Sequence, residues 1–234
     1  MGITEVDFHI GGHTFVVCGF DGKDTVLASD INQTASGVKK GFYAPISLEQ
    51  LRTARSSSFK PFPPKNLWLQ FNFAGFHKPS ANDIVEAIAQ TVDAHLNPPI
   101  KNFGVSGMRH AANQILKWPD LFSEHALRMN LFNLYIFIEI GGTGGGCFRP
   151  MFARFLNESA AITGNRAFLK SADSFEKIGH SFSRIALMFK DAATMKGLRG
   201  AILAASKRFR ELAEKEEEEY AFLEKNLHRE LQTQ

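Results

Sequence analysis

The sequence has little cysteine, little tyrosine or tryptophan, and little net charge. Its two cysteines, Cys18 and Cys147, are too few for the disulfide framework of a small secreted domain, so we expect free thiols and a cytoplasmic location. Three Tyr and two Trp beside 22 Phe indicate apolar packing and not a surface on which nucleic-acid bases stack. A net charge of +3 is too small to argue for a nucleic-acid partner.

Long apolar runs are also absent. A transmembrane helix needs about 18 consecutive apolar residues, and the best candidate, residues 131–140, is shorter and contains Asn133 and Glu139. Residues 1–9 carry acidic side chains and no apolar stretch, so we expect no secretory signal peptide. We therefore expect no membrane partner. An apolar content of 44% and a charged content of 22% are typical of a soluble globular protein.

The N-terminal region has the pattern of a β-hairpin. Residues 14–20 are rich in β-branched and aromatic side chains, and residues 25–30 form a second short run of this kind. Between them lies the turn signal DGKD (residues 21–24), because Asp-Gly tolerates the positive φ of tight hairpin turns. If the first residue of the turn faces the last, Phe20 faces Thr25.

The same register brings a histidine and a carboxylate together. Phe15 faces Asp30, and His13 lies diagonal to Asp30 on the same face of the hairpin. A carboxylate within reach of an imidazole fixes the tautomer of a catalytic histidine. Cys18 lies an odd number of residues from His13, so on a regular strand its side chain points to the opposite face and away from His13. The alternative is that His13 is a surface or packing residue and that Asp30 forms a turn at a strand end.

Three patterns follow the hairpin. Ser47 and Gln50 form a capping-box pattern at the start of a short helix. Prolines at positions 61, 63 and 64 exclude regular structure there. Residues 66–73 have the composition of one more strand that closes the sheet.

The remainder of the chain has helical periodicity, so we expect an α+β fold. A small antiparallel β-subdomain occupies residues 1–75, and an all-α domain occupies residues 76–234. The helix at 123–140 is apolar nearly all round, which predicts that it is the central, buried helix. The predicted helices span residues 80–95, 105–118, 123–140, 150–161, 173–193 and 196–231.

A glycine-rich run, GGTGGG (residues 141–146), separates two of these helices. One interpretation is a loop that binds a phosphate group at the N-terminus of the following helix. The run lacks the Lys-Ser/Thr of a P-loop and no strand precedes it, so it does not match that motif. As a nucleophile loop it would place Cys147 just before the helix N-terminus, where a thiolate is favoured. As a structural turn it lets two buried helices pass closely, and this is our default interpretation. We predict no cofactor and no metal ion.

The hairpin resembles the His and Asp strands of papain-like cysteine enzymes, most closely their C39-like branch. The matching residues are GHTFVVCGFD (residues 12–21) followed by VLASD (residues 26–30). In those enzymes the order along the chain is Cys, His, Asp, and the Cys lies at a helix N-terminus before the His strand. Only 12 residues precede His13, so we expect that the half with the nucleophile is absent from this chain.

The segment IEIGGTGGGCFRPMFARFLNE (residues 138–158) resembles the hallmark of the helical C-terminal domain of the butirosin biosynthesis protein H family. That family joins a papain-like N-terminal domain to a helical domain of unknown function. Its prototype resembles an acyltransferase that moves an acyl group from an acyl-carrier-protein thioester to an aminoglycoside amine. The resemblance implies that His13 is the general base and Asp30 its orienter. The residues that match the helical motif are Glu139, Gly142, Thr143, Gly144, Gly145, Gly146 and Arg149.

Two functions stay open. The chain is part of such an acyltransferase, with an acyl-carrier protein or another acyl thioester as partner, or it is a non-catalytic helical interaction domain with a vestigial β-subdomain. Glu139 and Arg149 flank the loop, and we expect them to form an ion pair that holds its shape. A partial sheet domain exposes a strand edge and an apolar face. We therefore predict a homo-oligomer, or a helical domain that folds over the sheet.

Overall fold

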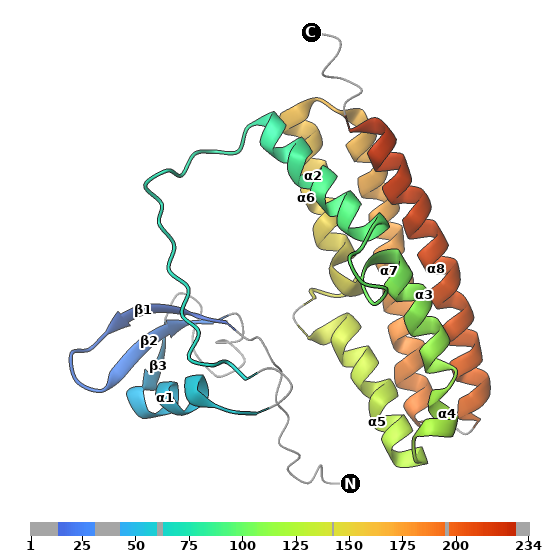
Figure 1. Cartoon of the computed structure of the whole chain (residues 1–234), viewed down its shortest axis with the longest axis horizontal. Coiled ribbons are helices and arrows are strands. Elements are labelled where there is room, and N and C mark those ends of the chain that lie inside the picture. The colour runs from blue at the N-terminus through green and yellow to red at the C-terminus, as the bar shows by residue number, and fades with distance from the viewer. Residues whose placement is uncertain (1–13, 31–42, 60–62, 142, 195–196, 228–234) are drawn as a thin grey trace. The chain divides into compact units, whose positions relative to one another are not determined.

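A computed structural model describes residues 14–30, 43–59, 63–141, 143–194 and 197–227 (Figure 1). The chain divides into two compact units, Met1–Phe76 and His77–Gln234. The first contains a small antiparallel sheet and one helix, and the second consists of helices. The α+β class expected from the sequence is confirmed.

The first unit contains a three-stranded sheet in the order β1-β2-β3. The strands are β1 (Val16–Phe20), β2 (Thr25–Ser29) and β3 (Ala44–Ser47), and helix α1 (Leu48–Ser56) follows. The carboxylate of Asp21 holds the hairpin turn, because it accepts hydrogen bonds from the backbone N–H groups of Lys23 and Thr25. The capping box at the start of α1 is confirmed, since Gln50 N lies 3.1 Å from Ser47 Oγ and Ser47 N lies 3.0 Å from Gln50 Oε1.

A β-bulge at Cys18 changes the predicted register at the turn. Phe20 pairs with Val26 and not with Thr25, whereas Val16 pairs with Ser29, which is the predicted register. The extra residue in β1 absorbs the difference of one position. Gly19, next to the bulge, is the sequence signal that could have indicated it, because a glycine inside a strand often marks a bulge.

The strand predicted at residues 66–73 is absent from the described sheet. Asn66 lies in a turn with a φ of 55°, and residues 67–73 have no regular secondary structure and form no ladder with β1, β2 or β3. Six large apolar side chains in and beside this segment are at least 58% exposed: Leu67, Trp68, Leu69, Phe71, Phe73 and Phe76. An apolar surface of this size is typical of an interaction site. The predicted homo-oligomer stays a prediction.

The second unit is a helical domain with a phenylalanine-rich core. Its elements are α2 (Ala81–Leu96), α3 (Gly104–Ile115), α4 (Trp118–Leu121), α5 (Glu124–Tyr135), η1 (Ile136–Ile140), η2 (Gly146–Phe148), α6 (Arg149–Thr163), α7 (Arg166–Thr194) and α8 (Leu198–Asn226). Helix α7 packs against α5, α6 and α8. None of the helices within the described residues is long and apolar enough to cross a membrane.

The central helix is α7, and the prediction that residues 123–140 form it is wrong. Four phenylalanines recur at every seventh position of α7 and are fully buried: Phe168, Phe175, Phe182 and Phe189. Residues 124–140 bury only Leu127, Leu131 and Ile138, and their other apolar side chains are partly or largely exposed. Apolar content alone therefore overestimated the burial of this helix. The last turn, η1, is a wider π-turn that leads into the glycine-rich loop.

Candidate functional site

The glycine-rich loop ends in a left-handed turn. Five consecutive residues, 144–148, have positive φ angles, of 70°, 82°, 57°, 52° and 68°. The last two are Cys147 and Phe148, and a left-handed conformation costs an L-residue about 1–2 kcal/mol. Helix α6 begins at Arg149, directly after this turn. Such strain persists only where neighbouring contacts enforce it, and it is concentrated at functional sites.

Close packing explains two of the glycines. A Cβ on Gly146 would lie 2.9 Å from the carbonyl oxygen of Gly179, in the middle of α7. A Cβ on Gly179 would lie 2.8 Å from Pro150 Cδ. The turn therefore touches the backbone of α7, which is the geometry that the structural interpretation of the loop predicts. The sequence motif does not include Gly179, and only its unusual place inside an amphipathic helix marks it.

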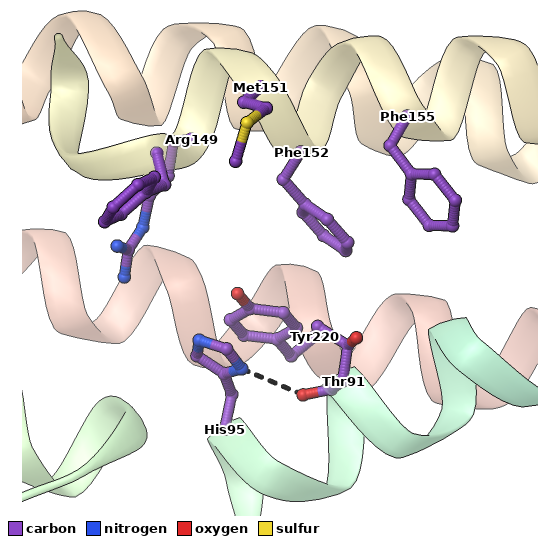
Figure 2. A pocket seen from close by; sticks show the side chains of 8 residues that line it. Thr91, His95, Arg149, Met151, Phe152, Phe155 and Tyr220 are labelled. Atoms are coloured by element: carbon purple, nitrogen blue, oxygen red, sulfur yellow. Dashed lines mark hydrogen bonds between the residues drawn. The ribbon is translucent and has the colours of Figure 1, made fainter. Parts of the chain in front are cut away.

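A pocket of about 300 Å³ lies beside this turn, among α2, the start of α6 and α8 (Figure 2). Its polar edge comes from His95 and Tyr220, whose rings stack with centroids 4.5 Å apart. The sequence motifs include neither residue, although Tyr220 continues the helical spacing of apolar residues that runs through Leu212 and Leu223. The full lining is Thr91, His95, Phe148, Arg149, Met151, Phe152, Phe155 and Tyr220.

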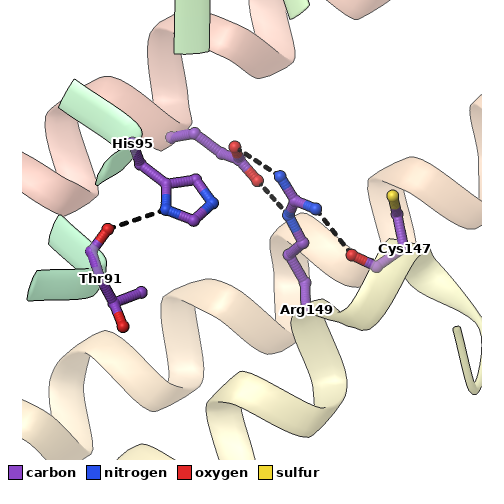
Figure 3. A network of polar contacts seen from close by, with 5 residues as sticks. Thr91, His95, Cys147 and Arg149 are labelled. Carbon is purple, nitrogen blue, oxygen red and sulfur yellow. Dashed lines mark hydrogen bonds and ion pairs between the residues drawn. The ribbon is translucent and has the colours of Figure 1, made fainter. Parts of the chain in front are cut away.

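Arg149 links the loop to α8 through a buried ion pair (Figure 3). Its Nε and Nη2 bind the two carboxylate oxygens of Glu216 at 2.5 and 2.9 Å, and its Nη1 donates to the Cys147 carbonyl oxygen at 2.7 Å. The Glu216 side chain is fully buried. Burial acts to lower the pKa of Arg149, but the hydrogen bonds and charge of Glu216 outweigh it and raise that pKa. Arg149 therefore stays cationic.

Glu139 holds the other side of the loop. Its Oε2 accepts hydrogen bonds from Gly146 N at 3.1 Å and from Ser183 Oγ on α7 at 3.0 Å. The buried Thr143 hydroxyl donates to the Ile138 carbonyl oxygen at 2.8 Å and accepts from Gly145 N at 3.3 Å. These side chains replace the backbone ladder that the glycines interrupt.

The predicted ion pair between Glu139 and Arg149 is not formed. The first turn of α6 directs Arg149 toward Glu216 on α8, and the loop's own N–H and Ser183 occupy the Glu139 carboxylate. Glu216 belongs to the acidic run 214–219, a composition that is typical of a solvated helix face. Its spacing of four residues from both Leu212 and Tyr220 is the signal that could have placed it on the buried stripe.

The two cysteines differ in exposure. Burial raises the pKa of the Cys147 thiol, which is half-buried, so a thiolate is not favoured there despite the adjacent helix N-terminus. Cys18 is exposed at the bulge of β1.

The predicted catalytic residues belong to the first unit. Asp30 is half-buried and directly follows β2. Val16 pairs with Ser29, and the pairing of Phe15 with Asp30 one residue further along stays a prediction. His13 and Gly142 lie outside the described residues. No group of three or more His, Cys, Asp and Glu side chains among residues that the structure describes could hold a metal ion.

The fold and the motif define a helical domain whose glycine-rich loop is fixed by a buried Arg–Glu pair. The sequence matches the family described as Domain of unknown function (DUF4872) over residues 49–223. The chain belongs to this family. The match begins in α1 and ends in α8, so it includes the loop, Arg149 and Glu216. No curated protein matches the chain.

Proposed function

We propose that this chain is part of a cysteine-type acyltransferase that moves an acyl group from a thioester to an amine. One observation carries the proposal: the helical unit has a preformed pocket, and its wall includes residues of the segment 138–158 that resembles the butirosin biosynthesis protein H family. A mostly apolar pocket of this size suits a small ligand or an acyl group. An acyl-carrier protein or another acyl thioester is the proposed partner.

The chemistry is a double transfer through a cysteine. A Cys thiolate attacks the thioester carbonyl carbon, a new C–S bond forms, and the donor thiolate leaves. The amine then attacks the acyl-cysteine, its proton passes to His13, and the Cys thiolate leaves. Asp30 holds the imidazole of His13 in the required tautomer. The position of Asp30 directly after β2 supports this assignment.

The nucleophile is the part that this sequence does not supply. Cys147 has a raised pKa, and Cys18 has the opposite parity to His13 in the predicted hairpin. We therefore propose that a separate polypeptide supplies the nucleophilic cysteine. The reading frame upstream of Met1, or a neighbouring gene, is the place to look for it.

The test is a reconstitution. The chain is incubated with an acyl N-acetylcysteamine thioester and an aminoglycoside amine, with and without the polypeptide encoded upstream, and the products are analysed by mass spectrometry. We expect an amide and an acyl-cysteine adduct only when both parts are present, and loss of the amide in His13→Ala. Amide formation that is unchanged in His13→Ala contradicts the proposed mechanism.

A second candidate function is a non-catalytic binding domain. It is favoured by the state of the loop: Glu139, Glu216 and Arg149 are already engaged with protein groups, and burial raises the pKa of Cys147. No group of the loop is then poised for covalent chemistry. The same reconstitution distinguishes the two, since a binding domain takes up ligand without turnover whether or not the upstream polypeptide is present.

A further inference from the structure

His95 presents a hydrogen-bond acceptor to the pocket. Its Nδ1 lies 2.8 Å from the Thr91 carbonyl oxygen. A carbonyl oxygen can only accept, so Nδ1 carries the hydrogen and, in the neutral ring, Nε2 carries a lone pair. Figures 2 and 3 show this second nitrogen on the side of the ring that faces Arg149. No residue described in the structure forms a hydrogen bond with Nε2.

Tyr220 presents a donor to the same pocket. The residue is only 2% exposed and lines the pocket, and its hydroxyl has no hydrogen-bond partner among the described residues. The hydroxyl oxygen itself is not a fully buried group, so it can donate a hydrogen bond to a ligand or to a water molecule in the pocket. Burial, and then the charge of Glu216, raise the pKa of the Tyr220 hydroxyl. It therefore keeps its hydrogen across the physiological range.

The two groups are preorganised in an otherwise apolar, neutral pocket. The His95 and Tyr220 rings stack at an interplanar angle of 22°, and Phe175 packs against Tyr220 with centroids 5.0 Å apart. Among the described lining residues, Arg149 is the only arginine, lysine or carboxylate, and Glu216 neutralises it. A charged ligand therefore finds no unpaired opposite charge in the pocket.

We propose that this pocket binds a small uncharged molecule with an apolar body and a carboxamide head. The N–H of the head donates to His95 Nε2, and its oxygen accepts from the Tyr220 hydroxyl. The apolar body packs against the Phe152 and Phe155 rings, which line the pocket across from His95 (Figure 2). The site requires neither a cysteine nor a thioester, so it stands whether or not the chain takes part in acyl transfer.

The first test uses three matched probes with the full chain carrying isotope-labelled histidine. Hydrocinnamamide has an apolar body and a carboxamide head, N,N-dimethylhydrocinnamamide lacks the N–H donor, and hydrocinnamate is anionic. We expect hydrocinnamamide to bind with a Kd of about 1 mM or tighter, as is usual for about a dozen non-hydrogen atoms. The other two should bind about tenfold more weakly. The NMR resonance of His95 Nε2 should move only with the primary amide.

Variants test the donor and the cavity. Tyr220→Phe removes the hydroxyl and keeps the ring, so the affinity for hydrocinnamamide should fall about tenfold. Tyr135→Phe is the matched control, because Tyr135 does not line the pocket, and its affinity should equal that of the unsubstituted chain. Phe155→Trp fills the cavity and should abolish binding.

Three results overturn the proposal. They are no saturable binding of hydrocinnamamide, equal binding of the primary and dimethylated amides, or unchanged affinity in a folded Tyr220→Phe. If Tyr220→Phe does not fold, the His95 resonance of the unsubstituted chain decides. A resonance that does not move on amide binding contradicts the proposed contact.

Discussion

Glu216→Ala should destabilise the helical unit far more than the removal of a neighbouring carboxylate. The Glu216 side chain is fully buried and that of Arg149 is 15% exposed, so the substitution leaves a largely buried cation without its partner. Removal of one partner of a buried ion pair costs about 3–5 kcal/mol. We expect the lower end, about 3 kcal/mol, because the guanidinium keeps some access to water. For a unit of this size that corresponds to a decrease in Tm of about 10 °C.

The control is Glu217→Ala, one residue further along α8. Glu217 forms a similar two-point contact with Arg109, but the side chains of this pair are 48% and 39% exposed. Exposed ion pairs contribute about 0–1 kcal/mol, so the Tm should change little. The double variant Arg149→Met, Glu216→Leu removes both charges and should recover most of the loss, since apolar replacement of a buried pair is often neutral.

The assay is urea and thermal unfolding followed by far-UV circular dichroism, with Cys147 alkylation as a local probe. Arg149 also donates to the Cys147 carbonyl oxygen, so loss of Glu216 should loosen the turn and speed alkylation. Equal changes in Tm for Glu216→Ala and Glu217→Ala would refute the reasoning. So would a double variant that is as unstable as the single one.

Three further predictions concern the loop, the thiols and a helix cap. In urea titrations, Gly146→Ala should lower the unfolding free energy by clearly more than Gly144→Ala. Both positions have positive φ, but of the two only a Cβ at Gly146 would meet the α7 backbone. Equal losses of unfolding free energy would contradict this packing. At mildly alkaline pH, iodoacetamide should modify the exposed Cys18 about tenfold faster than Cys147, because burial raises the pKa of the Cys147 thiol. Peptide mass spectrometry follows both reactions. Faster labelling of Cys147 would restore it as a candidate nucleophile. The hydrogen bonds from the Ser80 side chain and backbone lower the pKa of Asp83 below its ordinary value of 3.8. The stability that these bonds give is therefore present above pH 3.8 and is lost as the pH falls through the lower pKa of the folded state. Unfolding titrations should show a steeper loss of stability below about pH 4 in the unsubstituted chain than in Asp83→Asn.

Local patterns predicted the elements of this fold well where the signal is short-range. The capping box at Ser47 and the turn at Asp21 depend on residues within four positions of each other, and both are present. The helical remainder followed from apolar spacing. The strand expected at residues 66–73 failed for a different reason. Alternation is necessary for a strand, but a strand also needs to pair with a sheet edge, and these residues pair with neither edge strand of the described sheet, β1 or β3.

In the candidate site, too, the sequence predicted short-range features well and long-range contacts poorly. The motif located the loop because its glycines are consecutive in sequence, but the contacts that fix the loop join residues far apart. Arg149 reaches Glu216 across 67 positions, and Glu139 reaches Ser183 across 44. Glu139, the carboxylate at the other end of the loop, was therefore the wrong partner for Arg149. Once the helices pack, Glu216 is the carboxylate on the buried stripe of α8, and a buried arginine requires a carboxylate at that depth. The position of a charge on its helix face, and not its distance along the chain, determines which partner it meets.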